Sequence, residues 1–163
     1  MAKWGEGDPR WVVEHREDGK NVNNWHWTAT SKMAWVKERL GDLFNGVAHH
    51  TLPDDKGVLN ITGLKQVNGE ATITVRKGNK KLVIYDLNVS LSYEGHLSGS
   101  DKTVKGEVKV EDVSNGSEED EYIFTITVEG TGSEQDECKN GAEGLRPIIL
   151  EKIRQLIADL NEL

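Results

Sequence analysis

The chain has 163 residues, the usual size of one domain, and its hydrophobic fraction of 36% is enough to bury a single core. Charged residues make up 29% of the chain and the formal net charge is −8, which argues against a nucleic-acid partner. The longest apolar runs have four residues, far short of the roughly 20 needed to span a bilayer. We therefore predict one domain, residues 1–163, with neither a nucleic-acid nor a membrane partner.

The start of the chain and its cysteine content fit a reducing compartment. Residues 1–8 are polar and partly acidic, unlike a secretory signal peptide or a mitochondrial presequence. Cys138 is the only cysteine, so no disulfide can form within the chain. We predict a cytoplasmic protein that acts as a monomer.

A Trp-rich arm opens the sequence. All five tryptophans lie within the first 35 residues, and residues 1–28 show neither a helical nor a strand period. We predict an irregular arm there, held wherever its indoles find a pocket.

The first helix is predicted from Ser31 to Phe44, where apolar residues recur at three- and four-residue spacing. The hydroxyl groups of Thr28, Thr30 and Ser31 are expected to cap its N-terminus. Its end is expected near Asn45-Gly46, a pair that readily adopts left-handed backbone angles.

Beyond residues 53–57 the apolar period changes from 3.6 to 2, which predicts an antiparallel β-meander of four to five strands. Its first two strands are expected to meet in a turn at Asn68-Gly69. The next hairpin is expected at residues 76–81, where Gly78-Asn79 permits a tight turn. The residues predicted to face the core along the later strands are Val83, Tyr85, Leu87, Val89, Leu91, Tyr93, Val104, Val108, Val110, Tyr122, Phe124, Ile126 and Val128.

The remainder of the chain divides into polar loops and a final helix. Residues 114–121 and 130–144 are polar and without a period, so both are predicted to be mobile loops. The apolar stripe between Pro147 and Leu163 predicts a long C-terminal helix packed on the sheet. Together these elements predict an α+β domain in residues 29–163, with an N-terminal helix, an antiparallel β-meander and a long C-terminal helix.

A search for catalytic and metal-binding spacings finds none. The chain lacks a Gly-x-Ser-x-Gly elbow, a His-Glu-x-x-His motif, a Cys-x-x-Cys motif and the glycine patterns of nucleotide sites. His49-His50 has no identifiable third metal ligand, and the acidic run at residues 118–121 lacks the ligand order of an EF-hand. We interpret both as solvated loops and predict no enzyme activity, no cofactor and no metal.

Two neighbouring features favour a binding surface. Leu82 and Ile84 are apolar although they lie on the strand face opposite the predicted core series. Either another element of the chain covers them or a partner does. The preceding hairpin is basic in an otherwise acidic chain; a solvated turn would explain that, but its position beside the apolar pair favours a docking site. Its cations are Arg76, Lys77, Lys80 and Lys81.

The segments from Trp4 to Trp11 and from Asn21 to Trp27 resemble the N-terminal domain of activators of the heat shock protein 90 ATPase, a family of co-chaperones. The resemblance continues through the C-terminal helix. It includes the family's Arg-Lys-Gly motif at residues 76–78, preceded by Gly69-Glu70-Ala71. The chain departs from the common Arg-Lys-Gly-Lys pattern by an extra residue, Asn79, and full-length members continue into a second domain.

This resemblance implies a co-chaperone domain that binds the middle segment of heat shock protein 90 and stimulates its ATPase without catalysing a reaction itself. It implies electrostatic contacts from Arg76 and Lys77, assistance from Glu70, and apolar contacts from Leu82 and Ile84. It also implies a motif that modulates nucleotide handling, with a contact to the chaperone's N-terminal domain as a further option. That motif consists of Asn23, Asn24, Trp25, His26 and Trp27.

Two alternatives remain for the Trp-rich arm. Its aromatic side chains could pack on the body of the domain in a structural role. Alternatively, the protein could bind a small ligand, with Trp25, His26 and Trp27 stacking on a sugar or a base. Fluorescence quenching by small molecules in the absence of a chaperone would favour the second of these.

Overall fold

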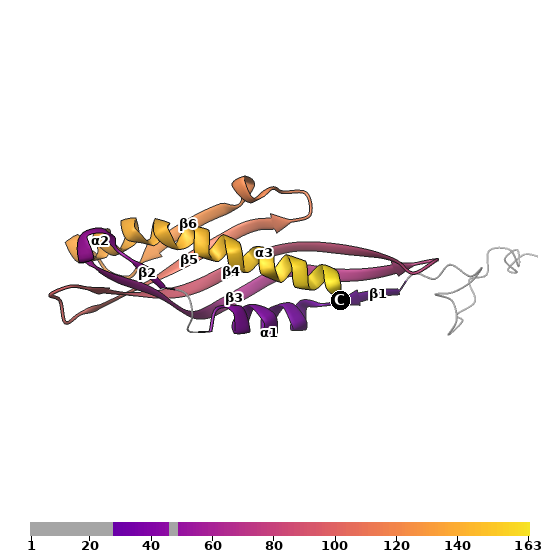
Figure 1. Cartoon of the computed structure of the whole chain (residues 1–163), viewed down its shortest axis with the longest axis horizontal. Coiled ribbons are helices and arrows are strands. Elements are labelled where there is room, and N and C mark those ends of the chain that lie inside the picture. The colour runs from indigo at the N-terminus through magenta and orange to yellow at the C-terminus, as the bar shows by residue number, and fades with distance from the viewer. Residues whose placement is uncertain (1–27, 46–48) are drawn as a thin grey trace, which may run out of the picture.

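One antiparallel sheet runs the length of the molecule, and helices lie along it in the computed structural model, which describes residues 28–45 and 49–163 (Figure 1). In chain order the elements are β1 (Thr28–Ser31), α1 (Met33–Leu43), β2 (His49–Thr51), η3 (Pro53–Asp55), β3 (Gly57–Arg76), β4 (Lys80–Leu97), β5 (Thr103–Ser114), η4 (Glu119–Glu121), β6 (Ile123–Val128), α2 (Ser133–Gly141), η5 (Ala142–Leu145) and α3 (Arg146–Glu162).

The long hairpin of β3 and β4 forms the centre of the sheet. The strand order is β1-β3-β4-β5-β6, and β2 also pairs with β3. Alternating side chains of β4 and β5 are buried on one face, as the period of two predicted. The predicted α+β class, antiparallel meander and two terminal helices are therefore confirmed. The short strands β1 and β2 are additions that the sequence did not predict.

The residues before the first helix form a strand, whereas a hydroxyl cap was predicted. Strand β1 pairs with β3, so that Thr28 lies opposite Val75 near the end of the β3–β4 hairpin. The N-cap residue of α1 is Lys32, which makes no side-chain cap bond; its N–H donates to the Ala71 carbonyl at 2.7 Å. Strand pairing is favoured over a helix cap because it gives hydrogen-bond partners to several backbone groups, whereas a cap gives a partner to one.

The Asn68-Gly69 pair lies inside β3, so the predicted turn there is wrong and the first two predicted strands are one. Gly69 has φ +117°, and a Cβ at this position would overlap the carbonyl of Asp86 on β4. The glycine therefore permits a close approach of two backbones. Two register shifts earlier in β3 each insert one extra residue, and each moves the following side chains to the other face of the sheet. The apolar residues of β3 therefore stay on the buried face.

Residues 130–144 contain a helix, whereas a loop was predicted. Helix α2 buries one residue, Cys138, and its other residues are polar or small. A single buried side chain gives no apolar period, so the sequence pattern did not predict this helix. The Cys138 thiol packs where Gly95 of β4 leaves room, since a Cβ at residue 95 would lie 2.6 Å from the sulfur. Burial raises the pKa of this thiol.

The acidic loop between β5 and β6 is tied to the C-terminal helix. It contains the short turn η4, in which the Glu118 N–H donates to the Glu121 carboxylate at 2.7 Å. Arg154 of α3 forms two hydrogen bonds to Glu119, the one from Nη2 to Oε2 measuring 2.8 Å. These contacts order a segment whose sequence alone predicted a mobile loop.

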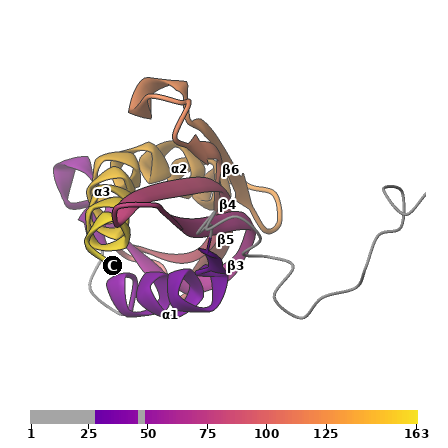
Figure 2. The same cartoon turned by 90° about the vertical axis from the view of Figure 1, so that its right-hand side faces the viewer.

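Helix α3 covers the apolar face of the sheet along most of its length, as predicted (Figure 1). Pro147 lies in its first turn, where the N–H that proline lacks would have had no intrahelical acceptor. Helix α1 lies next to α3 (Figure 2), where Arg39 Nε donates to Asp159 Oδ2 at 2.7 Å. The side chains that α3 buries are Ile149, Ile153, Leu156 and Leu160.

Candidate functional site

The predicted docking residues lie together at one end of the molecule, on the β3–β4 hairpin (Figure 1). Arg76 and Lys80 are paired across the last rung, and Lys77, Gly78 and Asn79 form the turn. Gly78 and Asn79 have φ values of +83° and +58°, a left-handed conformation that glycine and asparagine tolerate. The extra Asn79 is therefore accommodated in the turn and leaves the strand register intact.

Strand pairing places Leu82 and Ile84 on the open face of the sheet. They lie opposite Thr74 and Thr72, and their exposed fractions are 38% and 51%. Tyr85, which points to the other face, is 9% exposed. The prediction that Leu82 and Ile84 lie on the face opposite Tyr85 is confirmed. Ile84 is therefore about half exposed, whereas Thr74, opposite Leu82 on the same face, is buried.

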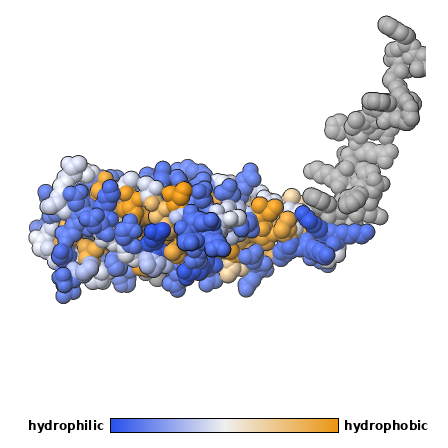
Figure 3. Space-filling model, turned by 90° about the horizontal axis from the view of Figure 1, so that it is seen from above, coloured by the Kyte–Doolittle hydropathy of each residue, from blue (hydrophilic) through white to orange (hydrophobic). Residues whose placement is uncertain are grey.

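The open face of the hairpin changes from acidic through apolar to basic toward the turn. Glu70 and Asp86 are cross-strand partners and both are exposed. Lys80 and Arg76 follow the apolar pair, and they lie roughly 20 Å from the two carboxylates along the strands, at about 3.3 Å per residue. Hydrophilic side chains gather at this end of the molecule, next to a hydrophobic patch (Figure 3). We call Glu70, Arg76, Lys80, Leu82, Ile84 and Asp86 the hairpin face.

The structure separates two of the predicted cations from this face. Lys81 is paired with Val75, so its side chain leaves from the opposite face of the sheet, and Lys77 lies in the turn. Among the residues that the structure describes, none of the ion pairs includes Lys77, Lys80 or Lys81. The hairpin end therefore presents ammonium groups to solvent on two faces and at the tip.

Asn115 supports the hairpin and was not singled out from the sequence. It follows the end of β5, where its side-chain Oδ1 accepts from the Tyr85 N–H at 2.6 Å and its Nδ2 donates to the Val83 carbonyl at 3.0 Å. Its own N–H donates to the Tyr85 carbonyl at 3.3 Å. The amide thus continues the β5 ladder by one position. The only sequence signal was an Asn-Gly pair at the end of a strand.

The modulating motif and the small-ligand alternative both rest on the Trp-rich arm, which lies outside the described residues. Asn23, Asn24, Trp25, His26 and Trp27 therefore stay predictions.

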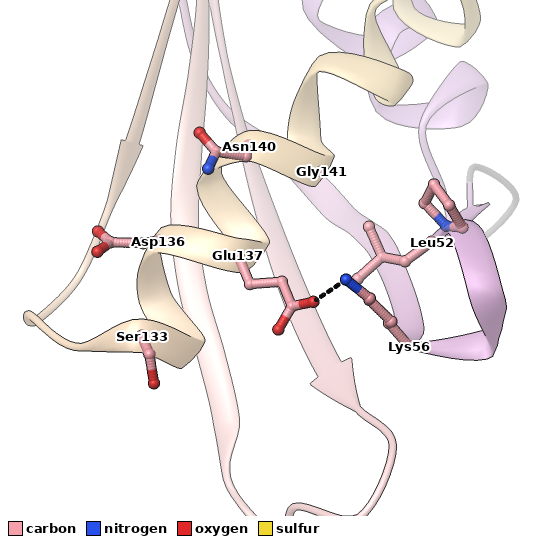
Figure 4. Close-up of a pocket in the computed structure, with 8 residues that line it drawn as sticks. Leu52, Lys56, Ser133, Asp136, Glu137, Asn140 and Gly141 are labelled. Carbon is pink, nitrogen blue, oxygen red and sulfur yellow. Dashed lines mark ion pairs between the residues drawn. The ribbon is translucent and has the colours of Figure 1, made fainter.

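A hollow lies at the other end of the molecule from the hairpin turn, between η3 and α2 (Figure 4). Leu52 and Gly141 line it, and Lys56 Nζ lies 3.4 Å from Glu137 Oε1 across it. Asp136 points away from this ion pair in Figure 4. Because its polar groups do not converge, this hollow does not have the arrangement of a catalytic or small-ligand site.

The two adjacent histidines lie in strand β2, whereas a solvated loop was predicted. His50 packs against Gly144, where a Cβ would overlap the imidazole ring. In the described segments, no group of three His, Cys, Asp or Glu side chains could hold a metal ion. No helix in these segments is long and apolar enough to cross a membrane.

Residues 30–163, which include every helix in the described part of the chain and the whole β3–β4 hairpin, match the protein family described as activator of Hsp90 ATPase, N-terminal. The chain belongs to this family. The match confirms the family that the tryptophan and Arg-Lys-Gly motifs indicated.

Several members of the Aha1 N-terminal family are similar to the chain. It is 45% identical over 127 residues to activator of 90 kDa heat shock protein ATPase homolog 2 from Bos taurus, covering 78% of this chain and 47% of that protein. It is 39% identical over 128 residues to homolog 1 from Homo sapiens, covering 78% and 36%. It is 30% identical over 145 residues to the Hsp90 co-chaperone AHA1 from Saccharomyces cerevisiae, covering 87% and 40%. The chain thus spans less than half the length of these Aha1-family relatives.

The Aha1-type fold is also seen in a solved structure. The crystal structure of Aha-1 from Plasmodium falciparum superposes with a TM-score of 0.51 at 16% sequence identity, covering 83% of this chain and 94% of that one. At this identity the likeness concerns the fold.

Proposed function

We propose that this domain binds the middle segment of heat shock protein 90 through the hairpin face and stimulates the chaperone's ATPase. Membership of the Aha1 N-terminal family supports the partner. The observation that carries the docking surface is the exposure of Leu82 and Ile84 beside the basic hairpin. The domain supplies no reacting group; it raises turnover by binding the ATPase-competent arrangement of the chaperone more tightly than the others.

The hairpin face has the composition of a small docking surface. Its apolar centre, Leu82 and Ile84, can be removed from water by a partner, which supplies the favourable free energy of burial. Charged groups on either side fix the orientation of the partner and raise the rate of association. Because the hairpin projects at one end of the molecule, a partner can reach the face without displacing the core.

The proposal is tested by the steady-state ATPase rate of heat shock protein 90 with and without the purified chain, using a chaperone-specific inhibitor to subtract background turnover. Stimulation is the expected result. Binding to the isolated middle segment without stimulation would restrict the function to docking. Absence of both effects would overturn the proposal.

The apolar centre gives a sharper test. Replacing Leu82→Ser together with Ile84→Ser should weaken binding to the middle segment about tenfold or more, since central apolar anchors carry most of the energy of an interface. Folding stability should change by about 1 kcal/mol or less per site because both side chains are partly exposed. Ile123→Ser is the matched control, because Ile123 is 47% exposed on β6. Equal affinities of the two variants would rule out the hairpin face.

We also propose that residues 23–27 modulate nucleotide handling by the chaperone, and that the chain acts as a cytoplasmic monomer. Support for the motif comes from its resemblance to the family alone. Trp25→Ala with Trp27→Ala should alter the apparent affinity of the chaperone for ATP while leaving docking on the middle segment unchanged. Loss of docking in this variant would assign the motif a structural role instead.

A further inference from the structure

Strand β4 extends beyond its neighbour β5 at the hairpin end. The last pair between them joins Asp86 to Ser114, so the first residues of β4, Lys80 to Tyr85, have β3 on one side only. Asn115 fills the first vacant position with its side-chain amide, which bonds the Tyr85 N–H and the Val83 carbonyl. The edge of β4 is therefore already built to receive amide groups in line with β5.

The direction of the next backbone groups follows from strand geometry. In an antiparallel sheet, alternate residues direct both their N–H and their C=O to the same side. The contacts of Asn115 show that the backbone N–H and C=O groups of Tyr85 and Val83 point away from β3. The backbone groups of Lys81, two residues earlier, therefore point away from β3 as well. Three groups consequently line the edge between Asn115 and the turn: the Val83 N–H and the Lys81 C=O and N–H. Among the described residues, none of these three has a hydrogen-bond partner.

The side chains around this edge define what could pair with it. On the open face the strand presents Ile84, then Leu82, then Lys80, with the carboxylate of Asp86 at the far end. An added strand places alternate side chains beside these residues. A segment with apolar residues in the middle and acidic residues toward the turn matches both the apolar centre and the ammonium groups. The reverse order would bring carboxylates against Asp86 and Glu70.

We propose that this edge, defined as Lys81 to Val83 together with the Asn115 amide, binds an extended acidic and apolar segment of the chaperone partner as an additional strand in line with β5. This inference rests on the proposed function and specifies how docking occurs. Main-chain hydrogen bonds supply affinity, and the side chains of the hairpin face set the direction and sequence preference of the bound segment.

Replacing the Val83 amide with an ester tests the inference, because the exchange removes one N–H and keeps the side chain. Strand addition predicts that binding to the chaperone's middle segment becomes roughly threefold to tenfold weaker, the effect of losing one amide hydrogen bond. An ester at Gly99 is the matched control, since Gly99 lies in the β4–β5 turn at the other end of the sheet. Equal affinities of the two esters would overturn strand addition.

The outcome distinguishes this inference from the proposed function. If Leu82→Ser with Ile84→Ser weakens binding but the Val83 ester does not, the hairpin face is the docking surface and strand addition is wrong. If neither change weakens binding, both proposals fail. If the Val83 ester abolishes self-association in sedimentation experiments and leaves chaperone binding intact, the edge pairs with a second copy of the chain and the inference is overturned.

Hydrogen exchange of the unmodified chain provides an independent readout. The amides of Lys81 and Val83 should exchange at least about tenfold more slowly in the presence of the middle segment, because both N–H groups acquire partners. The amide of Asp86 is the internal reference, because this residue already pairs with both neighbouring strands. Unchanged exchange at Lys81 and Val83 in the bound chain would contradict the added strand.

Discussion

Gly106 leaves the space that Tyr93 occupies. The two residues are cross-strand partners, and a Cβ at residue 106 would overlap both the Tyr93 ring and the Thr127 carbonyl. We expect Gly106→Ala to lower the free energy of unfolding by about 1–3 kcal/mol, because the buried ring has to move. Gly116→Ala is the control, since nothing lies within 4 Å of a Cβ there. Urea denaturation measures both, and equal stability of the two variants would refute the overlap.

The hydroxyl of the same tyrosine makes the fold sensitive to alkaline pH. Burial raises the pKa of Tyr93 to about 12, and its hydroxyl donates to the Thr127 carbonyl at 2.9 Å. Between pH 10 and 12 the unfolded chain has lost this proton while the folded chain keeps it, so stability falls as pH rises. The full loss is roughly 2–3 kcal/mol. Tyr93→Phe should show a shallower fall between pH 10 and 11.5 in urea titrations; identical slopes would contradict the assignment.

At the scale of elements, the free end of β4 depends on the amide of Asn115. Asn115→Ala should lower the free energy of unfolding by about 1–2 kcal/mol, because the Tyr85 N–H and the Val83 carbonyl lose their partners. Asn115→Asp should retain the bond from Tyr85 and lose the one to Val83. Hydrogen exchange at Tyr85 separates the two variants: fast exchange is expected for alanine and slow exchange for aspartate. Slow exchange in the alanine variant would show that the side chain does not hold this amide.

The elements that the sequence predicted are those in which one face is buried over many residues. Strand β4 and helix α3 repeat their apolar residues with a clear period, and both were found at the expected places. Helix α2 buries one residue, Cys138, so its sequence has no apolar period and predicted a loop. The Asn68-Gly69 pair carries a turn signal although it lies in β3, because the glycine is needed for close backbone approach.

The same argument explains how far the candidate site was predictable. Alternation along β4 is sufficient to place Leu82 and Ile84 on the face opposite Tyr85, and the same alternation places Lys81 on the side of Tyr85. The acidic end of the hairpin face depends on Asp86 lying opposite Glu70, a pairing that needs the register. The role of Asn115 depends on where β5 ends, which a single sequence does not specify.

Across the whole molecule, the net charge of −8 contrasts with the basic hairpin. Arg76→Glu with Lys77→Glu should weaken binding to the chaperone's middle segment, and raising the salt concentration should weaken binding of the unmodified chain. Lys102→Glu with Lys105→Glu is the control, since it changes net charge equally at exposed positions elsewhere. The control should bind nearly as well as the unmodified chain. If both variants lose affinity equally, total charge rather than the hairpin is responsible.

The pairing of Thr28 with Val75 has a consequence for the first 27 residues. Val75 adjoins Arg76, so the chain enters the described fold beside the hairpin face. The Trp-rich segment is covalently linked to this entry point, so its contact with a partner docked there would be intramolecular. A weak contact between that segment and a second region of the chaperone would then be more fully occupied once the hairpin is bound than the same contact made by a free peptide.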